Sequence, residues 1–187
     1  MSLLTASLIV AICILLEGFF SGSEIAVVSA DRLKLRGAAD AGHSGAARAL
    51  KLLDRPAFLL GTCLIGTNLC TVGASTAATA ALVSALPDFG EAAAVALLVP
   101  LILLGGELVP KSVYQHHADR LTPIIVYPLS LFSTLFRPVL LVIEAITKLS
   151  MRLTGGEGAV HRPVLREDII RLLDESEQVV MDEDDRE

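Results

Sequence analysis

Three short groups of polar residues interrupt the apolar segments of this sequence, and their side chains are the ones that could do chemistry. The groups are Ser21-Gly22-Ser23-Glu24, Gly66-Thr67-Asn68 and Gly106-Glu107. Ionisable residues inside apolar spans are costly, so their presence points to a function. The groups offer hydroxyl, amide, carboxylate and backbone oxygens, without imidazole or thiolate. Hard cations such as Mg²⁺ and Ca²⁺ prefer such ligands, whereas Zn²⁺ and Cu⁺ do not.

Two residues of the first group, Ser21 and Glu24, share one predicted helical face with Glu17, because the three follow an i, i+4, i+7 spacing. Gly18 and Gly22 are four residues apart, which lets another helix approach closely. Gly22 also permits a local break that would free backbone carbonyl oxygens. In the alternative interpretation, the serines bond back to their own helix and Glu24 reaches the membrane interface.

The other two groups each have a structural alternative as well. The amide oxygen of Asn68 can bind a hard cation, but an Asn in a span also joins helices by hydrogen bonds. Glu107 is the charge in an otherwise apolar run, and Lys111 four residues later could pair with it. We favour cation binding at Glu107, because a surface ion pair needs neither the adjacent glycines nor Pro110, which weaken the helix.

The composition predicts that these groups sit in a membrane protein. Of the 187 residues, 53% are hydrophobic and 19% are charged, with a mean hydropathy of +0.64, which argues against a soluble enzyme domain. The net charge of −6 argues against a nucleic-acid binder. No catalytic residue is predicted, because the first three apolar runs contain no His that could activate Ser21 or Ser23. The three cysteines lie in apolar runs and are interpreted as small buried side chains.

Three apolar runs are long enough to cross a bilayer, which predicts an all-α membrane protein. They cover Leu3–Ser29, Ala57–Leu86 and Ala92–Val109, with a tight turn at Pro87–Gly90. A fourth run, Ile124–Leu149, is interrupted by prolines and by Arg137. We expect it to form two helices, broken at Arg137-Pro138, that dip into or lie along the inner leaflet. A fourth crossing remains the alternative.

The distribution of charge predicts the orientation. Six of the fifteen bases lie between Asp31 and Arg55, whereas the turn Pro87–Glu91 has none. Because positive charge favours the cytoplasm, we expect the N-terminus outside and the C-terminus cytoplasmic, in the plasma (inner) membrane. The helical spacing of Ala46, Ala47, Leu50 and Leu53 predicts a short amphipathic juxtamembrane helix. Asp54 is expected to cap the second span, with Pro56 in its first turn.

The chain is expected to have two parts. Residues 1–153 form a transmembrane ion-transport domain with juxtamembrane helices. Residues 154–187 form an acidic cytosolic linker, with a hinge at Gly155–Gly158, a short helix over Pro163–Glu177 and a charged end. Eleven of the twenty-one acidic residues lie after residue 154. The chain is expected to stop where a further cytosolic domain would begin.

The three polar groups, in their order and spacing, resemble the transmembrane domain of the CorC/cyclin-M (CNNM) magnesium transporter family. The motifs that carry the resemblance are Ser21-Gly22-Ser23-Glu24, Gly66-Thr67-Asn68 and Gly106-Glu107-Leu108-Val109-Pro110-Lys111. The resemblance covers roughly Leu3 to Leu153. It implies a homodimer of three-helix subunits in the lipid bilayer, and Mg²⁺ export with Na⁺ as a candidate coupling ion. It also implies that the absent domain is a nucleotide-binding CBS domain.

Residue by residue, the resemblance implies Mg²⁺ ligands at Ser21, Ser23, Asn68 and Glu107. Backbone oxygens at Gly22 or Gly66 are further candidates for Mg²⁺ coordination. A non-transporting membrane scaffold or Mg²⁺ sensor, which would use the same residues for packing, is the alternative function. Transport direction, coupling ion and stoichiometry stay open at this point.

Overall fold

The computed structural model describes residues 2–153, with side chains as far as Ile146. Chain contacts define one compact unit over residues 1–144 and a second unit that begins at Ala145. Helices and short turns make up the described part, and it contains no strand. The expected all-α membrane fold is therefore confirmed. The predicted hinge, short helix and charged end beyond residue 153 lie outside the described residues.

Three long helical segments are apolar enough to cross a membrane. They are α1 (Leu3–Ser29), α4 (Pro56–Ala85) and a third span that comprises α5 (Gly90–Leu101), the π-helix η1 (Ile102–Leu108) and α6 (Val109–His116). The predicted spans thus form where the apolar runs lie in the sequence. The predicted irregularity of the third is confirmed as η1, which contains Gly105, Gly106 and Glu107.

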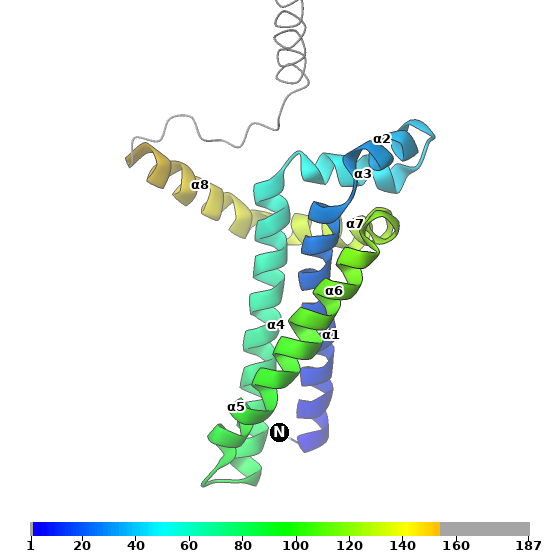
Figure 1. Ribbon diagram of the computed structural model, residues 1–187. Coiled ribbons are helices and arrows are strands. Elements are labelled where there is room, and N and C mark those ends of the chain that lie inside the picture. The colour runs from blue at the N-terminus through cyan, green and yellow to red at the C-terminus, as the bar shows by residue number, and fades with distance from the viewer. Residues whose placement is uncertain (1, 154–187) are drawn as a thin grey trace, which may run out of the picture. The chain divides into compact units, whose positions relative to one another are not determined.

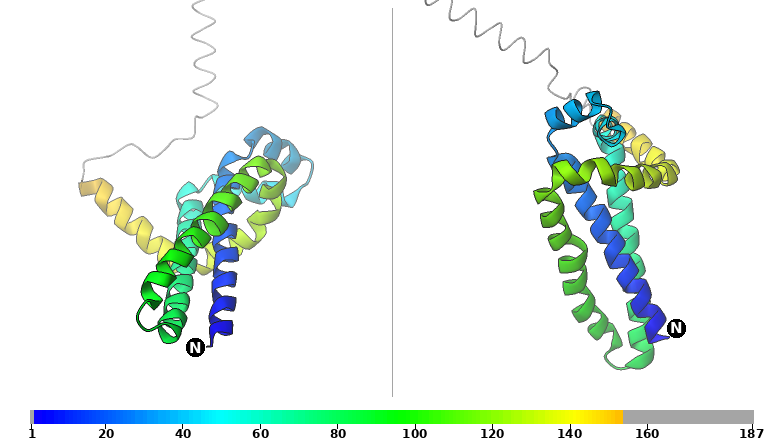
Figure 2. Two further views of the ribbon diagram at one scale, coloured as in Figure 1. Left: turned by 60° about the horizontal axis from the view of Figure 1, so that its bottom comes forward. Right: turned by 90° about the vertical axis from the view of Figure 1, so that its right-hand side faces the viewer.

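Helix α1 packs against both other spans, which makes it the central element of the bundle. It contacts α4 along one side and η1 and α6 along another, and the right-hand view of Figure 2 shows α1 between α4 and α6. A Cβ built on Gly18 would lie 2.9 Å from the Pro110 ring, and one on Gly22 would lie 2.7 Å from the Tyr114 ring. The expected close approach at these glycines therefore occurs, and α6 is the helix that approaches.

The base-rich segment forms two helices, α2 (Arg32–Asp40) and α3 (Ser44–Leu53), instead of the one predicted. They meet at Gly42, whose φ of 92° is a left-handed conformation that favours glycine. Both helices lie at the end of the bundle where α1 ends and α4 begins (Figure 1). Of the predicted apolar face of α3, Ala46 and Leu53 are buried and Ala47 and Leu50 are partly buried. Ala49, which was not predicted, is buried beside them.

The start of α4 corrects one expectation. Arg55 is the N-cap residue and makes no side-chain cap hydrogen bond, so Asp54 does not have the predicted role. Asp54 is instead the C-cap residue of α3, with helical backbone angles. Pro56 occupies the first turn, as predicted, because its missing N–H would have no partner there.

The fourth apolar run forms α7 (Ala118–Leu135) and α8 (Arg137–Leu153). The break before Arg137-Pro138 was predicted, and α7 and residues Arg137–Ile146 meet at a bend of 71°. Within the described residues the spans number three, or four if this bent pair counts as one. Length and composition thus leave the alternative of a fourth crossing open.

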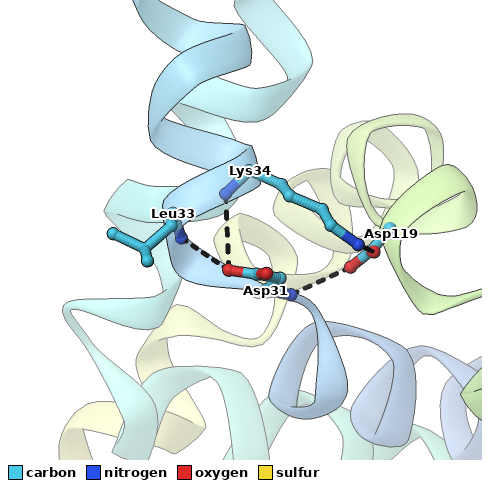
Figure 3. A network of polar contacts seen from close by, with 4 residues as sticks. All are labelled: Asp31, Leu33, Lys34 and Asp119. Carbon is cyan, nitrogen blue, oxygen red and sulfur yellow. Dashed lines mark hydrogen bonds and ion pairs between the residues drawn. The ribbon is translucent and has the colours of Figure 1, made fainter.

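A polar network ties the end of α1 to the start of α7 (Figure 3). Asp31 caps α2 by accepting hydrogen bonds from the backbone N–H groups of Leu33 and Lys34. Its own N–H donates to Asp119 Oδ1 at 2.9 Å, and Lys34 Nζ donates to Asp119 Oδ2 at 2.6 Å. The carboxylate of Asp119 thus joins the start of α2 to the segment that follows the third span.

Candidate functional site

The polar residues of the three spans converge on one pocket, which we call the inter-span pocket. Its volume is about 260 Å³. Each span contributes to its lining, which consists of Glu17, Ser21 and Glu24 from α1, Leu64, Thr67, Asn68 and Thr71 from α4, Glu107 from η1 and Lys111 from α6. Ser21, Asn68 and Glu107, each singled out from sequence, are therefore brought together.

Two buried groups of this pocket lack a hydrogen-bond partner in the described part of the chain. Glu17 is 4% exposed and Ser21 is 2% exposed, and neither Glu17 Oε2 nor Ser21 Oγ makes a hydrogen bond to a described residue. A buried polar atom without a partner costs free energy. Both atoms belong to residues that line the same pocket, so a bound cation or water could satisfy them together.

Glu17 is held in place by two neighbouring spans. Thr71 Oγ1 on α4 donates to Glu17 Oε1 at 3.0 Å. On the other side, a Cβ built on Gly106 would lie 2.9 Å from Glu17 Cδ. The glycine in the π-helix thus leaves the space that the carboxylate occupies. Any larger residue at position 106 would have to displace Glu17.

Asn68 and Glu107 line the pocket but already have partners on their own span. Asn68 Nδ2 donates to the carbonyl of Leu64 at 2.7 Å, which uses the amide nitrogen and leaves the side-chain oxygen for another donor or cation. Lys111 Nζ lies 2.8 Å from Glu107 Oε1, so the ion pair considered as an alternative is present. This pair is about half exposed, with 47% of the Glu107 side chain accessible.

Gly22, Ser23 and Gly66 do not line the inter-span pocket. Gly22 packs against Tyr114, and a Cβ built on Gly66 would lie 2.5 Å from the Phe20 ring. Ser23 is fully buried, and its hydroxyl has no hydrogen-bond partner among the described residues. The helix break that Gly22 would permit does not occur, because α1 continues without interruption from Leu3 to Ser29. The close packing of Gly22 against the Tyr114 ring explains why the residue is a glycine, and no helix break is needed.

The sequence placed Glu17 on the polar face of α1 and Thr67 in the second polar group, but neither was predicted to be a site residue, and Thr71 was not predicted to be one either. The i, i+4, i+7 spacing of Glu17, Ser21 and Glu24 was the available signal, since all three line the pocket. A threonine in an apolar helix usually bonds back to its own backbone, as Thr67 and Thr71 do here. Thr71 shares its single hydroxyl hydrogen between the Thr67 carbonyl and Glu17 Oε1, and the contact with Glu17 depends on the neighbouring span.

The oxygen atoms that line the pocket are suited to bind a hard cation. Carboxylate oxygens come from Glu17, Glu24 and Glu107, and neutral oxygens come from Ser21 and Asn68. Within residues 2–153, no three His, Cys, Asp or Glu side chains gather closely enough to hold a metal ion by themselves. A cation in this pocket would thus rely on neutral oxygens beside one or two carboxylates, which hard cations accept.

Comparison with known proteins identifies relatives for most of the chain. The family model described as the cyclin M transmembrane N-terminal domain matches residues 8–185. A UPF0053 protein of Haemophilus influenzae is 32% identical over 167 residues, which cover 89% of this chain and 40% of the relative. The UPF0053 inner membrane protein YfjD of Escherichia coli is 31% identical over 140 residues, which cover 75% of this chain and 33% of the relative.

A plant protein shows the same likeness. The DUF21 domain-containing protein At1g55930, chloroplastic, of Arabidopsis thaliana is 29% identical over 166 residues, which cover 89% of this chain and 25% of the relative. The chain thus spans at most about two fifths of the length of these curated relatives. Their similarity to this chain is confined to a part of each protein.

Proposed function

The chain belongs to the cyclin M transmembrane N-terminal domain family, and from that premise we propose that it forms the membrane core of a magnesium ion transporter. Mg²⁺ is the proposed cargo, and the inter-span pocket is its proposed binding site. The finer proposal is Mg²⁺ export, with Na⁺ as the candidate coupling ion. Transport requires no covalent chemistry by the protein, so we propose no enzymatic activity.

One observation carries this proposal. Ser21, Asn68 and Glu107 come from three different spans and line one pocket, where the buried carboxylate of Glu17 also has an oxygen without a partner among the described residues. A helix bundle stabilised by packing alone would gain nothing from leaving Glu17 and Ser21 unsatisfied. A divalent cation would satisfy both atoms and offset the negative charge in the pocket.

The pocket supports a simple sequence of events for transport. Mg²⁺ exchanges water for the oxygens of Ser21, Asn68, Glu17 and Glu107, and the ammonium of Lys111 leaves Glu107 as the cation arrives. The spans then rearrange so that the ion can leave on the opposite side. The segment best suited to move is η1, because a π-helix next to Pro110 has weaker and more easily exchanged backbone hydrogen bonds than an α-helix.

The site can be tested by the thermal stability of the purified chain in mild detergent, with and without Mg²⁺. A ligand that binds only the folded state at 100 times its dissociation constant stabilises it by about 2.7 kcal/mol. We expect the Mg²⁺-dependent rise in Tm to shrink in Glu107→Gln and Asn68→Ala, and to shrink most in Glu107→Ala. Glu91→Gln is the matched control, because this carboxylate is in the first turn of α5 and does not line the pocket.

Lys111→Ala separates cation binding from the ion pair. Lysine cannot ligate a cation, so this variant should keep most of the Mg²⁺ response. A purely structural pair predicts similar losses of stability in Glu107→Ala and Lys111→Ala, with the Mg²⁺ response unchanged in both. If Mg²⁺ stabilised Glu107→Ala as much as the wild type, Glu107 would not be a Mg²⁺ ligand and its role would be the ion pair with Lys111.

A scaffold or Mg²⁺ sensor is the second candidate function. It is favoured by the partners that Glu107 and Asn68 already have on their own span. Mg²⁺ flux into or out of liposomes, with and without a Na⁺ gradient, distinguishes the candidates. A transporter core moves Mg²⁺ and loses flux in Glu107→Ala, whereas a sensor binds Mg²⁺ without moving it.

The proposed assembly is a homodimer in the plasma (inner) membrane. Three spans by themselves enclose little space, and a two-fold partner would complete the walls of a transport path. Pro110 and Tyr114 of the same chain pack against Gly18 and Gly22. These glycines are therefore not free to contact a second copy, and the dimer would use other surfaces. Light scattering or crosslinking in mild detergent should give twice the chain mass. A monomer that still transports Mg²⁺ would refute the dimer.

A further inference from the structure

A second polar pocket lies outside the inter-span pocket, between α3, α7 and the start of α4, and we call it the basic pocket. Its volume is about 620 Å³, a size typical of small-molecule sites. The lining combines bases, hydroxyls and apolar side chains, namely Arg48, Lys51, Leu52, Asp54, Arg55, Phe58, Val126, Ser130, Ser133 and Thr134. None of these residues was singled out by the function argued above.

The three bases of this pocket come from α3 and from the start of α4. Arg48 and Lys51 are three residues apart on α3 and therefore share a face of that helix, and Arg55, the N-cap of α4, lines the same pocket. Asp54 is the acidic residue of the lining, so three positive charges face one negative charge. On α7, the spacing of Ser130, Ser133 and Thr134 likewise puts three hydroxyls on one side of the helix.

Contacts near the start of α3 hold α3 and α7, which form two walls of the pocket, close together. A Cβ on Gly45 would collide with the carbonyl of Pro123, so α3 and α7 approach closely there. Ser44 Oγ and Tyr127 Oη are hydrogen-bonded at 2.6 Å. The Arg48 guanidinium lies over the Tyr127 ring at 4.8 Å from its centre, which restrains this base of the pocket lining.

The lining is chemically suited to a phosphate group. Arginine offers paired N–H donors that match phosphate oxygens, and lysine adds a point charge. Ser130 and Thr134 now donate to backbone carbonyls of their own helix at 2.8 and 2.9 Å, so the bases carry most of the recognition. Phe58, Leu52 and Val126 supply an apolar wall beside the charges.

We propose that the basic pocket binds a phosphate group at the membrane surface, carried by the headgroup of an anionic phospholipid. Arg55 and Phe58 of the lining are at the start of the membrane span α4, so we expect the pocket to lie near the lipid headgroups. Basic pockets at such positions bind anionic headgroups in other membrane proteins. The apolar wall at Phe58 would contact the glycerol and the start of an acyl chain, which a free phosphate ion lacks.

The test measures the Tm of the full chain in neutral detergent during titration with phosphatidylglycerol, phosphatidylcholine or inorganic phosphate. The variant is Lys51→Gln/Arg55→Gln, which keeps the contact of Arg48 with Tyr127. The matched control is Arg32→Gln/Arg36→Gln, which removes the same charge from α2, outside the pocket. Ser133→Asp is a second variant, which adds a carboxylate and removes no base.

We expect phosphatidylglycerol to stabilise the wild type and the control equally, and phosphatidylcholine to have little effect. A base near an anionic surface contributes about fivefold in affinity, so the double variant should bind roughly 30-fold more weakly. Ser133→Asp should weaken binding in the same direction. Stabilisation by inorganic phosphate with the same variant dependence would assign the site to free phosphate and overturn the lipid source.

Two other results would overturn the site itself. Equal weakening in the control and in Lys51→Gln/Arg55→Gln would mean that only the general positive charge of the juxtamembrane segment attracts the lipid. Unchanged phosphatidylglycerol binding in both Lys51→Gln/Arg55→Gln and Ser133→Asp would place the lipid elsewhere on the protein. If the double variant does not fold, Ser133→Asp alone decides.

Discussion

Thr71 on α4 donates a hydrogen bond to Glu17 on α1, with 3.0 Å between the hydroxyl and carboxylate oxygens. This bond joins two spans that are 54 residues apart in sequence at these positions. Glu17 Oε2 has no partner in the described part of the chain, so this hydroxyl and any bound cation or water would together satisfy the carboxylate. The pair therefore links helix packing to the occupancy of the inter-span pocket.

The first prediction concerns this bond. Thr71→Val removes the donor and Glu17→Met removes the acceptor, and thermal unfolding of the single and double variants in detergent should show a coupling energy of about 0.6 kcal/mol, with about 1.7 kcal/mol as the upper bound. The control is Thr67→Val, because the Thr67 hydroxyl bonds to carbonyls of its own helix. Additive effects of Thr71→Val and Glu17→Met would contradict the bond.

The second prediction concerns the packing of α1 on α6. Gly22→Ala should destabilise the protein by about 1–3 kcal/mol, because the new Cβ would lie 2.7 Å from the Tyr114 ring. Gly37→Ala is the matched control, since a Cβ at that position would meet no described atom within 4 Å beyond its chain neighbours and the backbone of its own helix. Chemical unfolding in mild detergent measures both. A Gly22→Ala protein as stable as Gly37→Ala would show that the Tyr114 ring is not fixed there.

The third prediction concerns orientation. In a variant whose three cysteines are replaced by alanine, Ser44→Cys and Asp88→Cys should react from opposite sides of intact cells, with Asp88→Cys labelled from outside. The reason is the excess of bases around Ser44 and their absence from the Pro87–Glu91 turn. Outside labelling at both positions would exclude three crossings.

A further cysteine at Gly156 separates three crossings from four. Labelling of Gly156→Cys only from inside supports three crossings, with α7 and α8 on the cytoplasmic side. Labelling from outside supports a fourth crossing by the bent pair. The same cells and reagents serve for this probe, so Asp88→Cys is its internal control.

The fourth prediction concerns pH. The backbone N–H of Asp31 and then the ammonium of Lys34 lower the pKa of Asp119 below its ordinary value. Asp119 likewise raises the pKa of Lys34. A carboxyl group whose pKa is lowered on folding stabilises the protein at pH values above its pKa in the unfolded chain, near 3.9. This contribution is lost as the pH falls through the pKa of the group in the folded protein. The raised lysine pKa contributes stability below about 10.4, which is lost as the pH rises through the folded value.

The network should therefore stabilise the protein across neutral pH and weaken at both extremes. Asp119→Asn should lower the Tm at pH 7 and flatten its fall between pH 5 and pH 2.5, relative to the wild type. The effect should be small, because both groups are exposed and screened by solvent. Asp40→Asn, an acidic residue at the end of α2, is the control. Identical pH profiles for Asp119→Asn and the wild type would contradict the role of the network.

The positions of the spans and of their polar groups could be predicted without the structure. Whether a segment can cross a membrane depends on the length and apolarity of consecutive residues, so Leu3–Ser29 and the run that became α4 could be predicted closely. The depth of each polar group follows from its distance to the end of its span. A similar depth permits Ser21, Asn68 and Glu107 to converge, and in the structure they line one pocket.

The tertiary structure decided which faces of the helices meet. Spans such as α1 and α4 are apolar nearly all round, so periodicity gives little information on their rotation about their axes. That rotation is set by steric fit, which places Gly22 on Tyr114 and Thr71 against Glu17. The basic pocket needed the structure for the same reason. Arg55 and Ser133 face one space only because Gly45 lets α3 and α7 pack closely.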